Sequence, residues 1–235
     1  MKKRFWFILV MLLVVVLVLS GCGAKKTTLK MATGGTTGTY YAYSGTVSQV
    51  LSKKIPNLSF DVQSTGASKA NIYLISDKEA DIAIVQNDVM YYAYHGTDLF
   101  AGEKVTGFAA MAGVYAEVCQ VVAKSGINSI ADLRGKRVSV GDIGSGVEFN
   151  ARQILEAYGM TFDDIIVNNL SFGDSATAFK DDKIDAFFCV AGAPTTAIVE
   201  LATSNQIRLL EVDDEHAAKL MEKYPFYTKY NIPGG

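Results

Sequence analysis

Small and hydroxylated residues gather at three points where a strand-like run of the sequence gives way to a helix-like one. Residues 33–41 and 64–68 are rich in glycine, threonine and serine, and residues 141–148 repeat this composition in the other half of the chain. Backbone N–H groups at a helix start are free and lie at the positive end of the helix dipole. Small side chains also let a ligand approach the backbone. The chemistry that these stretches favour is therefore binding of an anionic group.

The candidate ligand-binding residues lie at these junctions and at two further strand ends. They are Gly35, Thr36, Thr37, Tyr41, Thr65, Gly66, Gln86, Ser145, Gly146, Val147 and Gly192. Asp88 follows a strand-like run and is interpreted as a helix cap, with capture of a ligand ammonium as the alternative. Tyr115 and Glu117 lie at the expected crossing between two halves of the chain, where residues contact both ligand and hinge.

Basic side chains are unevenly placed in this sequence. After Arg4 the arginines are Arg134, Arg137, Arg152 and Arg208, all in the second half. An anion bound by the first half must therefore be held by backbone donors, hydroxyl groups or Lys69. Arg152 has two open interpretations: it reaches the ligand, or it pairs with a glutamate one helical turn away, Glu148 or Glu156.

Catalytic and metal-binding patterns are missing from the sequence. The glycine-rich stretch lacks the Gly-Lys-Ser/Thr ending of a P-loop and the spacing of a dinucleotide fingerprint. His95 and His216 are isolated, without metal-ligand spacing, a nucleophile elbow or paired carboxylates. We therefore expect no enzyme, no metal and no cofactor.

Cys119 and Cys189 are interpreted as buried free thiols, and a disulfide between them remains the alternative.

The elements that must position these residues alternate along the chain. Strand-like runs fall at 29–33, 58–62, 81–85, 108–114, 118–123, 137–140, 165–170, 186–190 and 207–212. Helix-like patterns start near residues 39, 68, 87, 148, 175 and 195. Continuously apolar strands alternating with helices indicate mostly parallel sheets with helices on both faces. The sequence predicts an α/β protein of two such lobes with hinge strands between them.

The expected domain boundaries follow from this alternation. Residues 29–114 form the first lobe, 115–209 form the second lobe with its hinge strands, and 210–235 return to the first lobe. The ranges 116–122 and 208–212 are the expected crossing strands. A lobe just re-entered should need more strands and helices, so we interpret the sequence as truncated.

The first residues are typical of a secreted lipoprotein. Three basic residues precede an apolar run of 15 residues, 5–19, shorter than the 20 or so that span a bilayer. The sequence Leu-Ser-Gly-Cys at 19–22 resembles the bacterial lipobox. We expect a signal peptide at 1–21, lipidation of Cys22, a polar tether at 22–28 and an extracytoplasmic location, periplasmic or on the outer face. An uncleaved anchor is the alternative.

The net charge of the chain argues against a nucleic-acid partner. Removal of residues 1–21 would remove three basic residues and change the formal net charge from −2 to −5. Because the remaining chain is acidic and has no basic patch, we expect no nucleic-acid partner.

Four segments together resemble one family, the TAXI-type solute receptors of TRAP (tripartite ATP-independent periplasmic) transporters. They are GGTTGTYY at 34–41, DIAIVQND at 81–88, DLRGKRVSVG at 132–141 with GSG at 144–146, and DAFF at 185–188 with GAP at 192–194. The resemblance implies a two-lobed, periplasmic-binding-protein-like fold. It implies a glutamate-like amino acid or dicarboxylate as ligand, and a membrane permease driven by an ion gradient as partner. Val147 departs from the threonine that the family often has.

Two other functions remain as alternatives. Binding proteins of ABC importers for a phosphonate, sulfonate or aromatic acid have the same kind of fold. Residue composition and spacing do not distinguish such a protein from a TRAP receptor. A surface lipoprotein that adheres to a partner would need repeats or an exposed apolar patch, and the sequence shows neither.

Overall fold

The computed structural model describes residues 26–233, so the predicted signal peptide and Cys22 lie outside the described residues. The strands are β1 (Thr27–Ala32), β2 (Leu58–Gln63), β3 (Ile82–Ala83), β4 (Val118–Ala123), β5 (Arg137–Ser139), β6 (Ile166–Asn168), β7 (Ala186–Ala191) and β8 (Arg208–Leu210). The α-helices are α2 (Thr39–Lys54), α3 (Ser68–Ser76), α4 (Asn87–His95), α5 (Gly146–Ala157), α6 (Phe172–Lys180), α7 (Thr196–Ala202) and α8 (Asp214–Lys223). Short 3-10 turns lie at Asp98–Phe100, Ala131–Leu133 and Phe162–Asp164. None of the helices described is long and apolar enough to cross a membrane.

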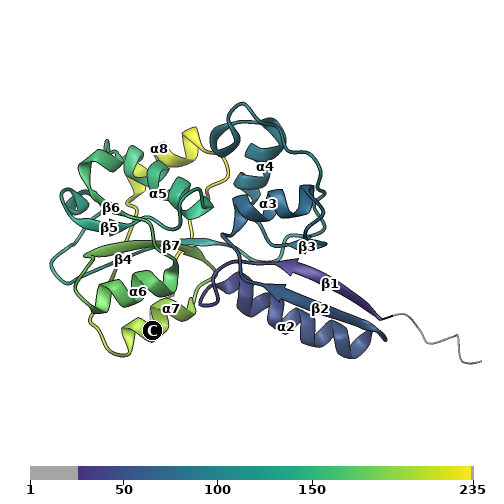
Figure 1. The fold of residues 1–235 in the computed structure, drawn as a ribbon. Helices are drawn as coiled ribbons and strands as arrows, with labels where there is room; N and C mark the ends of the chain where they lie inside the picture. The colour runs from purple at the N-terminus through teal and green to yellow at the C-terminus, as the bar shows by residue number, and fades with distance from the viewer. Residues whose placement is uncertain (1–25, 234–235) are drawn as a thin grey trace, which may run out of the picture.

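The first lobe is built on a parallel three-stranded sheet with the order β2-β1-β3 (Figure 1). Its first strand begins at Thr27, earlier than expected, because Thr27 and Thr28 pair with Leu58 and Ser59. The end of the expected polar tether is thus already part of the sheet. Helix α2 lies along β2, and α3 lies against α4.

The second lobe contains a five-stranded sheet with the order β6-β5-β7-β4-β8. Strands β5, β6 and β7 run parallel, and β4 runs antiparallel to both of its neighbours, β7 and β8. The expected crossing strands are therefore present as β4 and β8, which pair with each other. With mostly parallel sheets and helices on both faces, the predicted α/β class is confirmed.

Strand β7 explains why the second lobe has a core on each face of its sheet. Successive side chains of a strand point to opposite faces, so Phe188 packs in the core with α5 and α8 while Phe187 packs with α6 and α7. Cys189 belongs to the second of these cores, and Cys119 packs against the first. The two cysteines lie on opposite faces and are free thiols, as expected.

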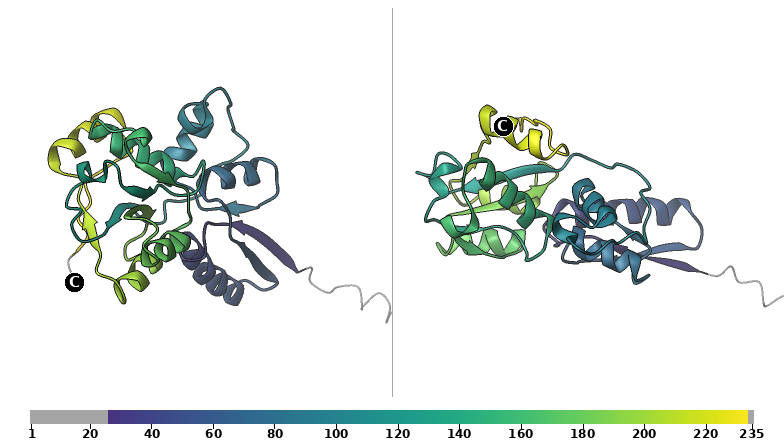
Figure 2. Two further views of the ribbon diagram at one scale, coloured as in Figure 1. Left: turned by 60° about the vertical axis from the view of Figure 1, so that its left-hand side comes forward. Right: turned by 90° about the horizontal axis from the view of Figure 1, so that it is seen from above.

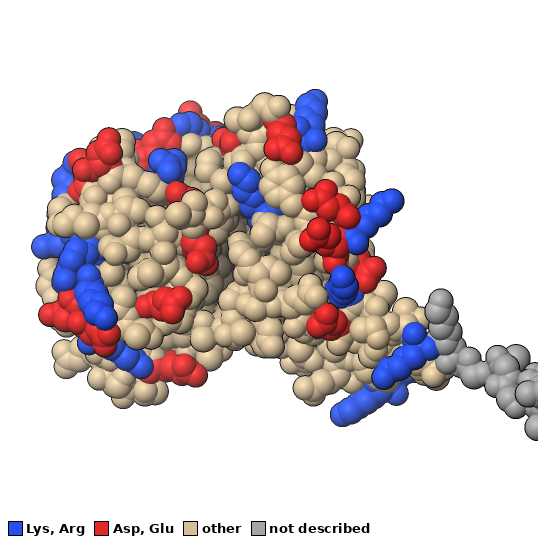
Figure 3. Space-filling view, in the orientation of Figure 1, with Lys and Arg blue, Asp and Glu red and all other residues tan. Residues whose placement is uncertain are grey.

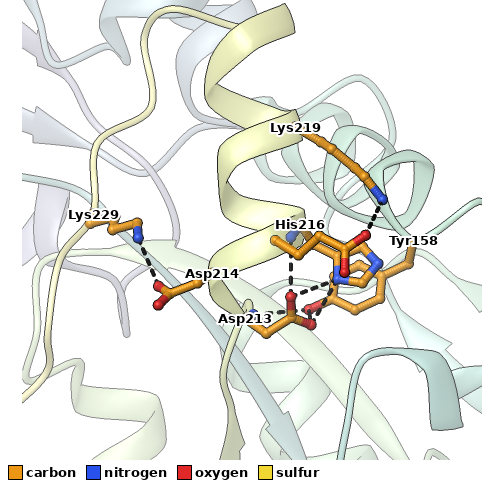
Figure 4. A network of polar contacts seen from close by, with 7 residues as sticks. Tyr158, Asp213, Asp214, His216, Lys219 and Lys229 are labelled. Atoms are coloured by element: carbon orange, nitrogen blue, oxygen red, sulfur yellow. Dashed lines mark hydrogen bonds and ion pairs between the residues drawn. The ribbon is translucent and has the colours of Figure 1, made fainter.

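Helix α8 is fixed to the second lobe by a polar network (Figure 4). Asp213 caps the helix by accepting a hydrogen bond from the His216 N–H at 3.1 Å, and it accepts another from the Tyr158 hydroxyl at 2.9 Å. The His216 and Tyr158 rings stack with centroids 3.7 Å apart. The segment after residue 210, expected to return to the first lobe, thus lies first on the second lobe. It reaches the first lobe through Phe226, which packs against Tyr91 of α4.

The connection from the first lobe to the second is an extended segment rather than a strand. Residues 108–114 form no strand, contrary to the sequence pattern, because no neighbouring strand pairs with them among residues 26–233. Met111 in this segment is 83% exposed. The segment borders a wide hollow of about 2250 Å³ beside the first sheet, where Met31, Phe60 and Ile82 present apolar side chains. Figure 2 shows the two lobes side by side with this segment passing between them.

Candidate functional site

A cleft of about 480 Å³ lies where the strand ends of the two lobes face each other. The first lobe supplies the loops after β1 and β2, and the second lobe supplies the loop after β5 and the start of α6. The lining residues are Gly35, Thr36, Thr37, Ser64, Thr65, Gly66, Asp142, Ser171, Gly173 and Asp174. The carboxyl ends of parallel strands are where ligands bind in open α/β sheets, so this cleft is the candidate site.

Hydrogen bonds within the first lobe hold its two loops together. Thr65 Oγ1 lies 2.8 Å from the Thr33 carbonyl and 2.7 Å from Asn71 Oδ1. The Asn71 amide, fully buried, donates to the same Thr33 carbonyl at 2.6 Å and to the Ile84 carbonyl at 2.8 Å. Thr65 is thus occupied in joining the strand ends, and its hydroxyl proton is used inside the lobe.

The first loop carries the hydroxyl groups that face the second lobe. Thr36 is exposed and Thr37 is half-buried. A Cβ placed on Gly173, at the start of α6, would lie 3.3 Å from Thr37 Oγ1. The absence of a side chain at position 173 therefore lets the loop after β1 approach the second lobe closely.

Two carboxylates form the second-lobe side of the cleft. Asp174 lies in the first turn of α6, where Ser171 caps the helix and donates its hydroxyl to the Asp174 carboxylate at 2.7 Å. Burial, and next the negative charge of Asp174, raise the pKa of Asp142 above its ordinary value. Figure 3 shows acidic side chains on the second-lobe side of the groove between the lobes. The cleft thus carries negative charge before any ligand enters.

None of the described cleft-lining residues is a lysine or an arginine. The Lys69 ammonium lies over the Phe100 ring, 5.4 Å from its centroid. Arg152 lies 3.6 Å from Glu148 and 4.1 Å from the centroid of the Phe162 ring, so the structure favours the helix-pair interpretation of this arginine. An anionic group in the cleft would have backbone N–H and hydroxyl donors, without a basic side chain.

The predicted site residues fall into two groups. Five line the cleft: Gly35, Thr36, Thr37, Thr65 and Gly66. Gln86 and Gly146 instead touch each other across the lobes, since a Cβ on Gly146 would lie 1.8 Å from Gln86 Oε1. Gly192 also makes a contact between lobes, where its carbonyl accepts a hydrogen bond from Thr39 Oγ1 at 3.2 Å.

The other predicted residues lie outside the described lining of the cleft. Ser145 caps α5 by accepting a hydrogen bond from the Glu148 N–H at 3.1 Å, so its hydroxyl serves the helix. Val147 is 6% exposed and packs in the second-lobe core, which leaves only its backbone N–H for a ligand. Tyr41 is half-buried on α2, outside the described cleft lining. Asp88 is not a helix cap, because Gln86 holds the cap position of α4.

Five cleft residues were not named as candidate ligand contacts. Ser64 and Asp142 lie within the predicted junctions 64–68 and 141–148, whereas Ser171, Gly173 and Asp174 lie outside every predicted junction. A signal was present for α6: Ser171 followed three residues later by Asp174 resembles a capping box, and it places the helix start before residue 175. Asp142 lies within the predicted junction 141–148, but that junction was predicted to bind through backbone N–H groups and not through this carboxylate.

A buried polar network joins the lobes beside the cleft. Asn150 of α5, 1% exposed, donates to Asp88 Oδ2 at 3.0 Å and accepts from Gln86 Nε2 at 2.6 Å. Its amide also donates to the Tyr227 hydroxyl at 2.7 Å. Burial raises the pKa of Asp88, and the hydrogen bond from Asn150 partly offsets that effect. The network lies in direct contact between α4 and α5, without space for a ligand group between Gln86 and Gly146.

A second buried carboxyl group lies at the crossing between the lobes. Tyr40 of α2 donates to Glu117 at 2.9 Å, and the Tyr40 hydroxyl lies 3.2 Å from Ser68 Oγ. Burial raises the pKa of Glu117 to about 8. The nearby Tyr115 hydroxyl has no hydrogen-bond partner within residues 26–233. Tyr115 and Glu117 thus lie in the segment that joins the lobes, where they border the wide hollow of about 2250 Å³ and not the cleft.

Across residues 26–233, no group of three or more histidine, cysteine, aspartate or glutamate side chains is placed to hold a metal ion.

Solved structures with the same fold include small-molecule-binding proteins, one of them periplasmic. The alkanesulfonate-binding protein SsuA of Xanthomonas axonopodis pv. citri, bound to MOPS, matches with a TM-score of 0.54 and 17% identity over 80% of this chain and 62% of its own. An arginine-specific periplasmic binding protein of Salmonella typhimurium matches with a TM-score of 0.51 and 15% identity over 80% of both chains. A structure from Bordetella bronchiseptica RB50 matches with a TM-score of 0.59 and 18% identity over 78% of this chain and 56% of its own. The chain thus spans less than two thirds of the SsuA and Bordetella proteins.

The sequence profile of one protein family matches nearly the whole described chain. Residues 31–235 match the NMT1-like family, a span that begins within β1 and includes every later helix and strand and every residue of the cleft. The chain therefore belongs to the NMT1-like family and has the two-lobed fold of periplasmic binding proteins.

Proposed function

We propose that this protein is an extracytoplasmic solute-binding protein that captures a small, glutamate-like amino acid and delivers it to a TRAP-type membrane permease. The observation that carries the proposal is the cleft of about 480 Å³, lined by strand-end loops from both lobes. Its volume lies within the range of about 300–1,000 Å³ that is usual for small-molecule sites. Binding in such a cleft needs no bond to be made or broken.

The two sides of the cleft suit the two ends of an amino acid. The loops after β1 and β2 offer backbone N–H groups and the hydroxyls of Thr36 and Thr37 to a carboxylate. The carboxylates of Asp142 and Asp174 offer charge-assisted hydrogen bonds to an ammonium group. A dicarboxylate would leave these two aspartates facing a like charge, which disfavours binding. The acidic wall therefore favours the amino-acid form of the predicted ligand.

The transporter type rests on the sequence motifs at 34–41, 81–88, 132–146 and 185–194, which resemble TAXI-type receptors. The fold similarity to an alkanesulfonate-binding protein supports the second candidate equally well, a binding protein of an ABC importer for a sulfonate, phosphonate or aromatic acid. A signal peptide at 1–21 and a lipid on Cys22 belong to the same proposal and would place the protein on the outer side of the membrane.

A ligand screen tests the proposed function directly. Thermal unfolding of the purified protein is followed with glutamate, glutamine and arginine, with amine-free succinate and 2-oxoglutarate, and with taurine and ethanesulfonate. A ligand that binds the folded state at a hundredfold excess over its Kd stabilises it by about 2.7 kcal/mol. We expect glutamate or glutamine to raise the Tm. If ethanesulfonate alone does so, the ABC alternative replaces the TRAP proposal, and if a cooperatively unfolding protein responds to none, solute binding of this class is wrong.

A further inference from the structure

Asn150 is the residue through which the second lobe holds the start of α4. Its amide nitrogen donates to Asp88 Oδ2 at 3.0 Å, and its amide oxygen accepts from Gln86 Nε2 at 2.6 Å. Asn150 and Asp88 are 1% and 5% exposed, so both partners are desolvated by the contact. Every polar atom of the Asn150 side chain is thereby satisfied by protein groups rather than by a ligand.

The Gln86 side chain also fills the space at the start of α5. An ideal Cβ on Gly146 would lie 1.8 Å from Gln86 Oε1 and 3.1 Å from Val89 Cγ2. Real Cβ contacts are essentially never this short, so the Gln86 side chain can take this position only because residue 146 has no side chain. The Gln86 amide therefore occupies the helix start at which a ligand group was expected.

Satisfied hydrogen bonds stabilise this contact between the lobes. A buried amide or carboxylate without partners would oppose closure by about 1–3 kcal/mol, but Asn150 and Asp88 satisfy each other. Tyr227 strengthens the arrangement, because its hydroxyl accepts from the Asn150 amide at 2.7 Å and donates to Gln153 at 2.6 Å. The contacts that Gln86, Asp88, Asn150 and Tyr227 make with one another therefore use none of the residues that line the cleft.

We propose that Gln86, Asp88 and Asn150 form a latch that closes the two lobes before a ligand binds. Ligand entry into the cleft then requires the latch to open, and the fraction of open molecules limits the rate of entry. The latch involves only contacts between the two lobes, so its test does not depend on the proposed ligand class. Asn150 and Gln86 act as positioning residues, because they set the distance between lobes and do not line the cleft.

Three variants of the full chain test the latch. Asn150→Ala removes the shared partner, Gln86→Ala removes the amide at the start of α5, and Gly146→Ala keeps every polar group but displaces Gln86 by steric contact. Asn168→Ala is the matched control, since the Asn168 side chain on β6 donates only to the Ile166 carbonyl of its own strand. Small-angle X-ray scattering without ligand measures the radius of gyration, and amide hydrogen exchange measures opening at residues 146–150.

We expect the wild type and Asn168→Ala to match the scattering of the closed structure, and the three latch variants to give a larger radius of gyration. Exchange at residues 146–150 should quicken by about two- to twelvefold, the change for one lost hydrogen bond. An open wild type, or latch variants that stay as compact and protected as the wild type, would overturn the proposal. Should Asn150→Ala fail to fold, Gln86→Ala decides, because Gln86 is only partly buried. A screen in which no ligand binds would leave this result unaffected.

Discussion

Tyr40 donates a hydrogen bond of 2.9 Å to Glu117, and this bond ties the first long helix of one lobe to the segment that crosses to the other. The carboxyl group is largely buried, and the negative charge of Asp88 acts on it in the same direction as burial, raising its pKa. Burial raises the pKa of Glu117 to about 8. The hinge of this protein thus holds a carboxyl group that carries a proton at neutral pH.

This protonation predicts an unusual dependence of stability on pH. Between its ordinary pKa of 4.5 and its folded value of about 8, Glu117 binds a proton in the folded protein but not in the unfolded chain. The free energy of unfolding should therefore fall as pH rises through this window. Glu117→Gln keeps an acceptor oxygen for Tyr40 but cannot ionise, so the decline should flatten, with a remainder from Asp88.

Urea unfolding at pH 5, 6, 7 and 8 measures the effect on stability. The exposed Glu222→Gln is the matched control and should follow the wild type. A Glu117→Gln profile as steep as that of the wild type would show that Glu117 is ionised in the folded protein.

The two aspartates of the cleft should select ligands that carry an amine. Asp142→Asn and Asp174→Asn each remove one charge from the cleft wall. Hydrogen bonds to charged groups contribute about 1.5–3 kcal/mol, so glutamate binding should weaken by roughly ten- to a hundredfold, as measured by calorimetry. Binding of succinate should weaken less or improve. Asp181→Asn, an exposed aspartate of the same lobe, is the control. Unchanged glutamate affinity in both cleft variants would contradict the amino-acid assignment.

Thr36 and Thr65 should differ in what their substitution changes. The Thr65 hydroxyl contacts the Thr33 carbonyl and Asn71, so Thr65→Val should lower the free energy of unfolding by about 1 kcal/mol. Thr36 is exposed at the cleft, so Thr36→Val should leave the Tm unchanged and weaken ligand binding. Thermal unfolding and calorimetry on the same two proteins separate the roles. If Thr65→Val instead weakens ligand binding and leaves the Tm unchanged, Thr65 contacts the ligand directly.

The loop after β2 stores backbone strain at Ala67. Its φ of 64° and ψ of −147° lie in a region that is essentially restricted to glycine and costs about 1–3 kcal/mol. Ala67→Gly should therefore raise the free energy of unfolding by about 1 kcal/mol. The matched control is Ala70→Gly, inside α3, which should lower it by about 0.5–1 kcal/mol. Equal destabilisation by both changes would show that Ala67 is not strained.

Local patterns predicted most of the elements that carry the site. The strand Val118–Ala123 was predicted with its observed bounds, and the strands that begin at Leu58, Arg137 and Ala186 were predicted from their first residues. These segments combine a continuous apolar run with glycine or polar residues at the ends, a pattern that local sequence contains in full. The first-lobe half of the cleft followed because glycines and threonines mark the ends of β1 and β2.

The run 108–114 shows where local pattern was insufficient. It is apolar and strand-like, but a strand forms only when a neighbouring strand supplies hydrogen bonds, and residues 26–233 offer none at this place. Composition at these positions contains no information about the neighbour, so the pattern alone predicted the wrong structure.

The relation between the lobes was decided only in the tertiary structure. Glycine at 146 and glutamine at 86 are 60 positions apart in the sequence, and neither residue type indicates that one fills the space left by the other. The same holds for Asp142 and Asp174, which become one acidic wall when β5 and the start of α6 face the first lobe. By itself the sequence determined the elements, their order and the chemistry at several strand ends. The tertiary structure decided which ends meet, because contacts between distant segments depend on how the two lobes pack, and no local periodicity encodes that packing.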